Sequence, residues 1–284
     1  MYRKKLCLGL SSQLGIPFEA QIRLMHRIGF DGFFSNWAPD QDAAVLRSVA
    51  NETGMMYQSI HAPFGKMADM WNPTEITETA VSELLGCLRD CADNAVEIMV
   101  VHAFIGFEDH SPTAFGIDTF GRIVSEVEKL GVKIAFENTE GEEYLAALMD
   151  AFRGNNSVGF CWDTGHELCY NYGKDMMALY GDRLIATHLN DNLGIRDFGG
   201  RIFWHDDLHL LPFDGIADWE NIVYRLNKYG YDGILTFEIK KCNQKGGHEK
   251  DAYERMSPVE FICEVHKRAC RVAALKLRDK NIHI

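Results

Sequence analysis

The feature that most constrains the fold is a regular alternation of short β-rich runs with longer segments of helical periodicity. Eight runs rich in apolar and β-branched residues recur, at residues 5–12, 31–37, 56–63, 97–104, 133–140, 158–165, 184–191 and 233–240. Apolar residues at helical spacing follow in residues 18–28, 43–51, 76–94, 119–130, 144–152, 176–180, 219–229 and 258–277. Eight such repeats predict parallel strands joined by crossover helices.

This alternation is compatible with a closed barrel and with an open, doubly wound sheet. The chain has 284 residues, and a (β/α)8 barrel needs about 250. None of the strand-like runs is followed by a Gly-rich phosphate loop of the kind that marks many open nucleotide-binding sheets. No linker rich in Pro, Gly or Ser divides the sequence. We therefore predict a single-domain (β/α)8 TIM barrel over residues 1–284.

Charge and cysteine content narrow the class of partner. The formal net charge of −12 opposes binding to nucleic acid, because phosphate backbones attract proteins with an excess of lysine and arginine. The apolar runs are too short to cross a membrane, and the N-terminal one is expected to be a strand instead of a signal peptide. The eight cysteines form no CxxC pair, so we expect reduced thiols in a cytoplasmic protein. The oligomeric state stays open, and a homo-oligomer is compatible with the sequence.

Six consecutive strand-like runs finish in a residue that can ionise or bind a metal. These residues are His61, His102, Glu137, Asp163 with His166 just beyond it, His188 and Glu238. In a (β/α)8 barrel the carboxyl ends of the strands meet at the face that carries function. Each residue alone is more often a structural or solvated group, but burying several together is costly unless they pair or hold a cation. Glu137, Asp163, His188 and Glu238 together offer three carboxylates and one imidazole. This set of ligands suits Mn²⁺, Mg²⁺, Co²⁺ or Zn²⁺.

A loop-like segment after the seventh run, residues 204–219, contains further candidate ligands. Asp207 and His209 form a D-x-H pair that can face one ion or one substrate hydroxyl together. A polar loop without any ligand would contain the same residues, and both interpretations stay open.

The order and spacing of these segments resemble the xylose isomerase-like TIM-barrel superfamily. The segments that carry the resemblance span nearly the whole chain and read SIHAPF, VVHAF, AFENTE, FCWDTGH, THLNDN, HDDLH and GYDGILTFEIK. This superfamily includes sugar-phosphate isomerases and epimerases, ketose 3-epimerases and endonuclease IV-type apurinic endonucleases.

The resemblance to ketose 3-epimerases implies one metal ion and a proton-transfer reaction. The implied metal ligands are Glu137, Asp163, His188 and Glu238. Glu137 and Glu238 would also be the acid and base that move a proton beside a carbonyl, through an enediolate. His166 would contact the substrate or a second metal ion, with Gly165 turning the chain between Asp163 and His166. His61 and His102 would bind substrate hydroxyls or a second metal ion. Glu143, or the adjacent Glu142, would contact the substrate as well.

The resemblance to endonuclease IV implies a different chemistry at overlapping residues. Nine positions match that group's ligands for three zinc ions: His61, His102, Glu137, Asp163, His166, His188, Asp207, His209 and Glu238. The segments GLSSQLG and LLPFDG depart from its pattern, and the net charge opposes a duplex-binding groove. We therefore predict a metal-dependent sugar or sugar-phosphate isomerase or epimerase. The alternatives are a zinc-dependent phosphodiesterase acting on abasic DNA and a barrel that binds a sugar or metal without catalysis.

The sequence leaves open which sugar and which carbon are involved, how many ions bind, and whether the substrate carries a phosphate. Solvated surface charge explains most of the basic residues near the strand ends. Those that could still serve a phosphate are Lys66, Arg196, Arg201, Lys240 and Lys241.

Overall fold

The computed structural model describes residues 4–108, 111–196 and 204–282, and its eight strands form one parallel sheet. They are β1 (Leu6–Gly9), β2 (Gly32–Asn36), β3 (Met56–His61), β4 (Ile98–His102), β5 (Lys133–Glu137), β6 (Val158–Asp163), β7 (Leu184–His188) and β8 (Leu235–Phe237). Each strand from β1 to β6 pairs with the next in the chain, and β1 also pairs with β8. Between β7 and β8, a bridge joins Leu189 and Phe237, and the Leu189 N–H donates to the Thr236 carbonyl at 2.8 Å. The predicted (β/α)8 barrel is confirmed, and it is nearly closed.

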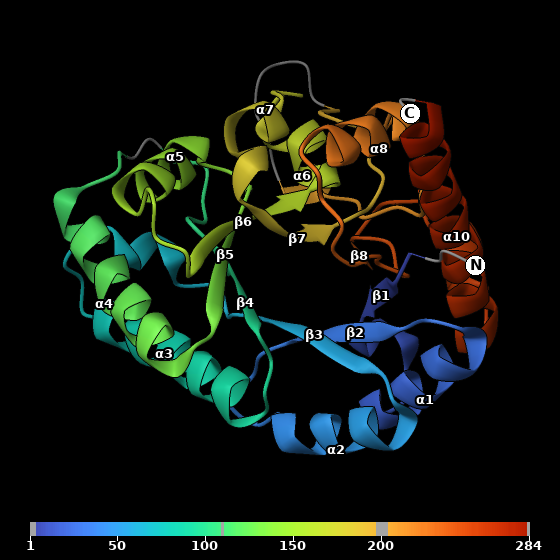
Figure 1. The fold of residues 1–284 in the computed structure, drawn as a ribbon, viewed down its shortest axis with the longest axis horizontal. Coiled ribbons are helices and arrows are strands. Elements are labelled where there is room, and N and C mark those ends of the chain that lie inside the picture. Colours follow the sequence, from blue (N-terminus) through green and yellow to red (C-terminus); the bar gives the residue numbers. More distant parts are fainter. Residues whose placement is uncertain (1–3, 109–110, 197–203, 283–284) are drawn as a thin grey trace.

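Helices surround this barrel as an outer ring (Figure 1). They are α1 (Phe18–Ile28), α2 (Ala43–Thr53), α3 (Thr77–Asp93), α4 (Ala114–Leu130), α5 (Glu142–Ala151), α6 (Thr164–Cys169), α7 (Met176–Tyr180), α8 (Trp219–Lys228), α9 (Asp251–Glu254) and α10 (Pro258–Ile282). Short 3₁₀ turns are η1 (Ser12–Leu14), η2 (Met67–Met70), η3 (Gly181–Arg183) and η4 (Trp204–Asp206). Among the helices of residues 4–108, 111–196 and 204–282, none has the length and apolar character needed to span a membrane.

The alternation of side chains along the strands divides the core into two parts. Phe136 on β5 packs against Phe120 on α4, with ring centroids 5.7 Å apart, and so belongs to the large core between the barrel and the helices. Its neighbour Ala135 faces the other way, because successive strand residues point to opposite faces. It joins a small buried cluster inside the barrel with Val100, Cys161 and Ala186. These small side chains leave room for the larger polar residues at the ends of the same strands.

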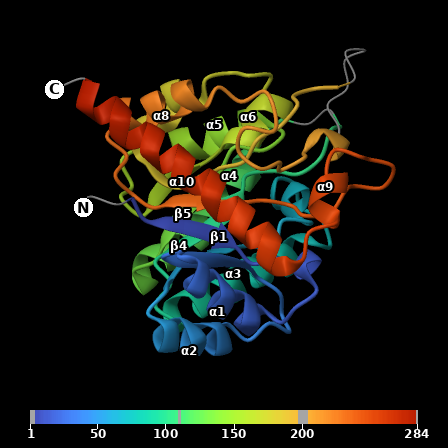
Figure 2. The same ribbon diagram turned by 90° about the vertical axis from the view of Figure 1, so that its right-hand side faces the viewer.

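Strand register places those polar residues at one level. His102 is aligned with Glu137 across β4 and β5, and Asp163 with His188 across β6 and β7. The loops beyond these strand ends include α9, which lies on the opposite side of the molecule from the N-terminus (Figure 2). The polar residues therefore gather at the carboxyl ends of the strands.

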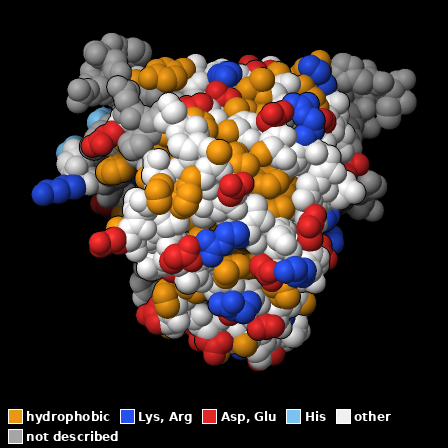
Figure 3. Space-filling view, turned by 90° about the vertical axis from the view of Figure 1, so that its left-hand side faces the viewer, with side chains coloured by type: hydrophobic (Ala, Val, Ile, Leu, Met, Phe, Trp, Pro, Cys, Tyr) orange, Lys and Arg blue, Asp and Glu red, His pale blue; other side chains and the backbone are white. Residues whose placement is uncertain are grey.

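The helix ring carries mixed charge on the side that holds α3 and α4. Figure 3 shows this side of the molecule, where Lys and Arg side chains lie among Asp, Glu and apolar side chains. Arg122 on α4, for example, donates to both carboxylate oxygens of Glu78 on α3. Interspersed charges of this kind produce little of the concentrated positive field that attracts a nucleic-acid backbone.

Candidate metal centre

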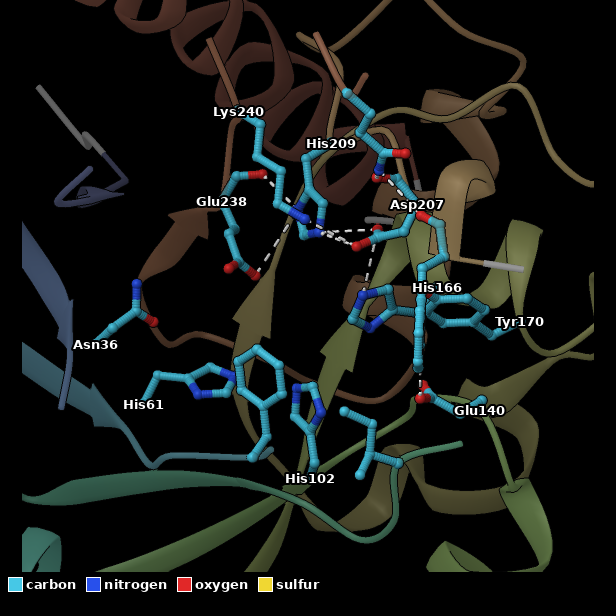
Figure 4. A pocket seen from close by; sticks show the side chains of 14 residues that line it. Asn36, His61, His102, Glu140, His166, Tyr170, Asp207, His209, Glu238 and Lys240 are labelled. Atoms are coloured by element: carbon cyan, nitrogen blue, oxygen red, sulfur yellow. Dashed lines mark hydrogen bonds and ion pairs between the residues drawn. The ribbon is translucent and has the colours of Figure 1, made fainter. Parts of the chain in front are cut away.

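A cavity of about 460 Å³ at the carboxyl ends of the strands gathers most of the predicted site residues. It is lined by Asn36, His61, Phe64, His102, Ile105, Glu140, His166, Tyr170, Trp204, Asp207, His209, Glu238, Lys240 and Gln244. Figure 4 shows His61 and His102 on one side of this space and Glu238 and His209 on the other. Strand ends and the segment after β7 thus contribute to one site.

Glu137, the last residue of β5, lies fully buried behind these imidazoles. Its Oε1 is 2.8 Å from Nδ1 of His188, and its Oε2 is 3.2 Å from Nε2 of His61 and 3.4 Å from Nε2 of His102. Burial alone would raise the pKa of Glu137, but the surrounding imidazoles, that of His188 first, hold this pKa well below its usual value. The side chain is therefore an ionised carboxylate with an imidazole at each oxygen.

Glu137 belongs to a four-residue group that can hold a divalent ion. One donor atom from each of Glu137, Asp163, His188 and Glu238 lies within 4.8 Å of all the others. The Nδ1 of His188 also lies 3.1 Å from Oε2 of Glu238. Burial, reinforced by the charges of Glu137 and Glu238, raises the pKa of Asp163 despite the nearby imidazoles of His166 and His209. Three converging carboxylates of this kind fit a divalent cation, which would offset their repulsion.

Three histidines have their rings oriented by backbone carbonyls. Because a carbonyl only accepts hydrogen bonds, Nδ1 of each ring donates: His61 to Ala62 at 2.8 Å, His166 to Asn138 at 3.0 Å, and His209 to Glu238 at 3.2 Å. Each Nε2 then faces a carboxylate oxygen, at 3.2 Å for His61, 3.4 Å for His166 and 2.8 Å for His209. These rings are therefore oriented as metal ligands are.

Besides a group in which Cys161 joins Glu137 and His188, two further groups of donors adjoin the four-residue group. The first consists of His61, His102 and Glu137, and the second of His166, Asp207 and His209. Glu137 is shared by the first of them and the four-residue group. His209 adopts a left-handed backbone conformation, with φ of 48°, and its Nε2 lies 2.8 Å from Oδ1 of Asp207. All nine residues that match the three-zinc pattern thus lie in three adjoining clusters.

Asp163 begins a short helix as well as ending a strand. Its Oδ1 accepts the backbone N–H of His166 at 2.7 Å, which caps α6, and its Oδ2 accepts the side chain of Asn190 at 2.8 Å. The expectation that Gly165 turns the chain is wrong, because Gly165 lies within α6. Glycine is required there by close packing: a Cβ at this position would lie 1.9 Å from Oδ1 of Asn190.

The segment that carries Asp207 and His209 is fixed to the barrel by the buried carboxylate of Asp191. Its Oδ1 accepts the backbone N–H groups of Asn192 and Ala217, at 2.9 and 3.0 Å. Its Oδ2 accepts the N–H of Phe213 at 2.9 Å and the indole N–H of Trp219 at 2.8 Å. Asp191, although it ends a predicted strand, is therefore an anchor for the loop and not a member of the donor groups.

Glu143, unlike the other predicted site residues, neither lines this cavity nor belongs to the donor groups beside it. Both Glu142 and Glu143 line a neighbouring cavity of about 450 Å³, where Glu142 pairs with Lys174 at 2.6 Å. The carboxylate that lines both cavities is Glu140, which accepts the Gly106 N–H at 3.0 Å. Sequence reasoning missed Glu140, although it stands three residues after Glu137 at the same strand end.

Of the basic residues considered for a phosphate, Lys240 alone lines the cavity among those within the described ranges. Lys66 pairs with Glu83, Arg196 with Asp206 and Glu249, and Lys241 donates to the Glu254 carbonyl. Arg201 lies outside the described residues.

Comparison with known proteins gives concordant matches. A model of the xylose isomerase-like TIM barrel family matches residues 22–257. The chain is 35% identical over 244 residues to a Sinorhizobium fredii protein named "uncharacterized protein y4fM", covering 72% of this chain and 75% of that one.

Solved structures of low sequence identity share the fold. A structure of IolI protein with a bound zinc atom has a TM-score of 0.74 at 16% identity, covering 95% of this chain and 98% of that chain. A structure of L-ribulose 3-epimerase has a TM-score of 0.72 at 14% identity, covering 99% and 98%. The chain also spans 41% of the length of a fusion of a xylose isomerase-like TIM barrel with a 4-hydroxyphenylpyruvate dioxygenase, at a TM-score of 0.68, 13% identity and 89% coverage of this chain.

Proposed function

The chain belongs to the xylose isomerase-like TIM barrel family, and we propose that it is a divalent-metal-dependent isomerase or epimerase of a sugar or sugar phosphate. The observation that carries this proposal is the convergence of Glu137, Asp163, His188 and Glu238, whose donor atoms lie within 4.8 Å of one another. The similarity in fold to L-ribulose 3-epimerase supports the same class of reaction.

The two glutamates of this group differ in their access to a substrate. Glu238 lines the cavity and its side chain is 21% exposed, whereas Glu137 is fully buried. Glu238 is therefore the group placed to take a proton directly from a carbon beside a carbonyl. A proton moving to or from Glu137 would pass along His61 or His102, whose Nε2 atoms face its Oε2.

A divalent ion held by the four ligands would polarise the substrate carbonyl and stabilise negative charge on its oxygen. The chain's own residues contribute orientation and exclusion of water. Phe64 stacks on His102 with ring centroids 4.6 Å apart, and Trp204 lines the cavity near Glu140. These aromatic rings offer flat apolar surfaces for the carbon face of a sugar.

The proposal is tested by replacing Glu238 with glutamine. Purified protein supplied with Mn²⁺, Co²⁺, Zn²⁺ or Mg²⁺ is incubated with a panel of ketoses and ketose phosphates in deuterated water, and NMR follows exchange of the proton beside the carbonyl. Glu238→Gln should lower turnover about 10²–10⁴-fold, the contribution of a positioned general base. Glu220→Gln, on the exposed start of α8, is the control and should leave turnover unchanged. Wild-type turnover in Glu238→Gln would reject the assignment.

A second candidate, metal-dependent phosphodiester cleavage, is favoured by the three adjoining donor groups. With three ions bound, the groups around Glu137, Asp163 and Asp207 would suit activation of a hydroxide. The net charge of −12 opposes a nucleic-acid substrate. Cleavage of a duplex containing an abasic site, together with three zinc ions per chain, would favour this candidate over the isomerase.

We also propose a cytoplasmic location for the protein. All eight cysteines are free thiols and five of them are buried, which is the state expected in a reducing compartment.

A further inference from the structure

The group formed by His166, Asp207 and His209 differs from the other two donor groups because a lysine already contacts it. Nζ of Lys240 lies 2.9 Å from Oδ2 of Asp207. The opposite oxygen, Oδ1, faces Nε2 of His209 at 2.8 Å and Nε2 of His166 at 3.4 Å. Figure 4 shows the lysine side chain crossing above the imidazole of His209 toward Asp207. The hydrogen bonds of Lys240 and His209 both go to Oδ2, whereas Oδ1 is buried beside the two imidazoles without a hydrogen bond of its own among the described residues.

The backbone near Lys240 keeps the lysine close to Asp207. The Lys240 N–H donates to the His209 carbonyl at 3.1 Å. The side chain of Gln244 donates to the Asp207 carbonyl and to the Trp204 carbonyl, both at 2.9 Å. These bonds join the segment after β8 to the segment after β7, so the stem of Lys240 starts beside the loop that its ammonium group reaches.

The other two donor groups have no such cation. Among the ion pairs of the described residues, none joins a lysine or arginine to Glu137, Asp163 or Glu238.

A fixed positive charge at Asp207 opposes a divalent ion at the same donors. Like charges a few ångströms apart repel strongly in a partly buried site. The charge-assisted hydrogen bond from Lys240 to Oδ2 also offsets the carboxylate charge that would attract an ion to Oδ1. Lys240 and a third ion therefore compete for the negative charge of one carboxylate.

We propose that Lys240 is a built-in cation that excludes metal from the group of His166, Asp207 and His209 and presents its ammonium group to the substrate in place of an ion. This inference rests on the proposed function, because the four-residue group is taken to hold the catalytic metal. The proposal predicts that each chain binds fewer than three metal ions. It also makes Lys240 a determinant of specificity, since the cavity then offers a hydrogen-bond donor at this wall instead of a Lewis acid.

The test compares zinc content in matched variants of the full chain. Each protein is stripped with chelator, saturated with zinc, freed of excess metal and analysed by mass spectrometry for zinc per chain. Lys240→Met should bind one zinc ion more than the wild type. Lys66→Met is the matched control, because Lys66 is also a paired lysine, 38% exposed against 36% for Lys240, and it should leave the content unchanged.

A second variant keeps the test decisive if Lys240→Met does not fold. Asp207→Asn in the otherwise wild-type chain should leave zinc content unchanged, because the proposal places no ion on that carboxylate. Loss of one zinc ion in Asp207→Asn, equal zinc in Lys240→Met and wild type, or three zinc ions in the wild type would each overturn the proposal.

Failure of the proposed function would look different. If the four-residue group holds no ion, the wild-type zinc content will not change on Glu238→Gln. A gain of one zinc ion in Lys240→Met would still uphold the role of the lysine in that case.

Discussion

Replacing the buried Asp191 with asparagine should cost a large part of the stability of the fold. The carboxylate accepts four hydrogen bonds, two at each oxygen, with Asn192 and Ala217 at one and Phe213 and Trp219 at the other. An amide keeps one acceptor oxygen, so in either orientation two donors face its NH₂ group. A buried donor that loses its acceptor costs about 1–3 kcal/mol. The free energy of unfolding should therefore fall by about 2–6 kcal/mol, out of the roughly 5–15 kcal/mol of a typical domain.

Denaturant unfolding followed by circular dichroism measures this change in free energy. Asp182→Asn, at an exposed position in η3, is the matched control and should shift the free energy of unfolding by no more than about 0.5 kcal/mol. A loss below about 1 kcal/mol in Asp191→Asn would refute the reasoning, because it would mean that the four donors do not depend on the carboxylate. The wild-type slope of free energy against denaturant should be retained in both variants.

The remaining predictions concern proton release and close packing. Although burial lowers the pKa values of His166 and His188, the carboxylates around them raise both pKa values well above the usual imidazole value. In the ion-free protein their contribution to stability is therefore complete below about pH 6.5 and is lost as the pH rises through the raised pKa values. A metal ion that binds His188 must displace the proton of its imidazole, so metal affinity should rise with pH through the neutral range. Calorimetry at pH 7 in two buffers of different ionisation enthalpy would count the protons released on metal binding. A count of zero would contradict the prediction. Gly165→Ala should cost about 1–3 kcal/mol, because its Cβ would overlap Asn190; unchanged thermal unfolding would show that the contact can relax.

The strands and most helices were predictable because each has its own apolar periodicity. Residues 18–28 and 176–180 coincide with α1 and α7. Two short helices were not predictable for a physical reason. α6 has six residues and begins where the side chain of Asp163 accepts the N–H of His166, and α9 has four residues. Neither is long enough to show a helical repeat in the sequence.

The convergence of the strand-end residues was predictable from the barrel alone, since parallel strands bring their carboxyl ends to one face. The details of the site that depend on loops were not predictable in this way. The place of Glu140 at the cavity, where the resemblance to ketose 3-epimerases had implied Glu143, depends on how the chain leaves β5. The contact between Lys240 and Asp207 depends on the path of two loops and on the left-handed conformation of His209, which no local pattern announces.

Pairing between neighbouring strands has a consequence for redesign of this barrel. The hydrogen-bonded ladder aligns His102 with Glu137 and Asp163 with His188, so the spacing of these side chains is a property of the sheet. Grafting foreign loops after β3 or β4 would reshape the entrance without moving them. Lys240 and the D-x-H pair of Asp207 and His209 belong to the loops instead. Exchanging those segments would change which substrates or ions the site binds and leave the barrel interior unchanged.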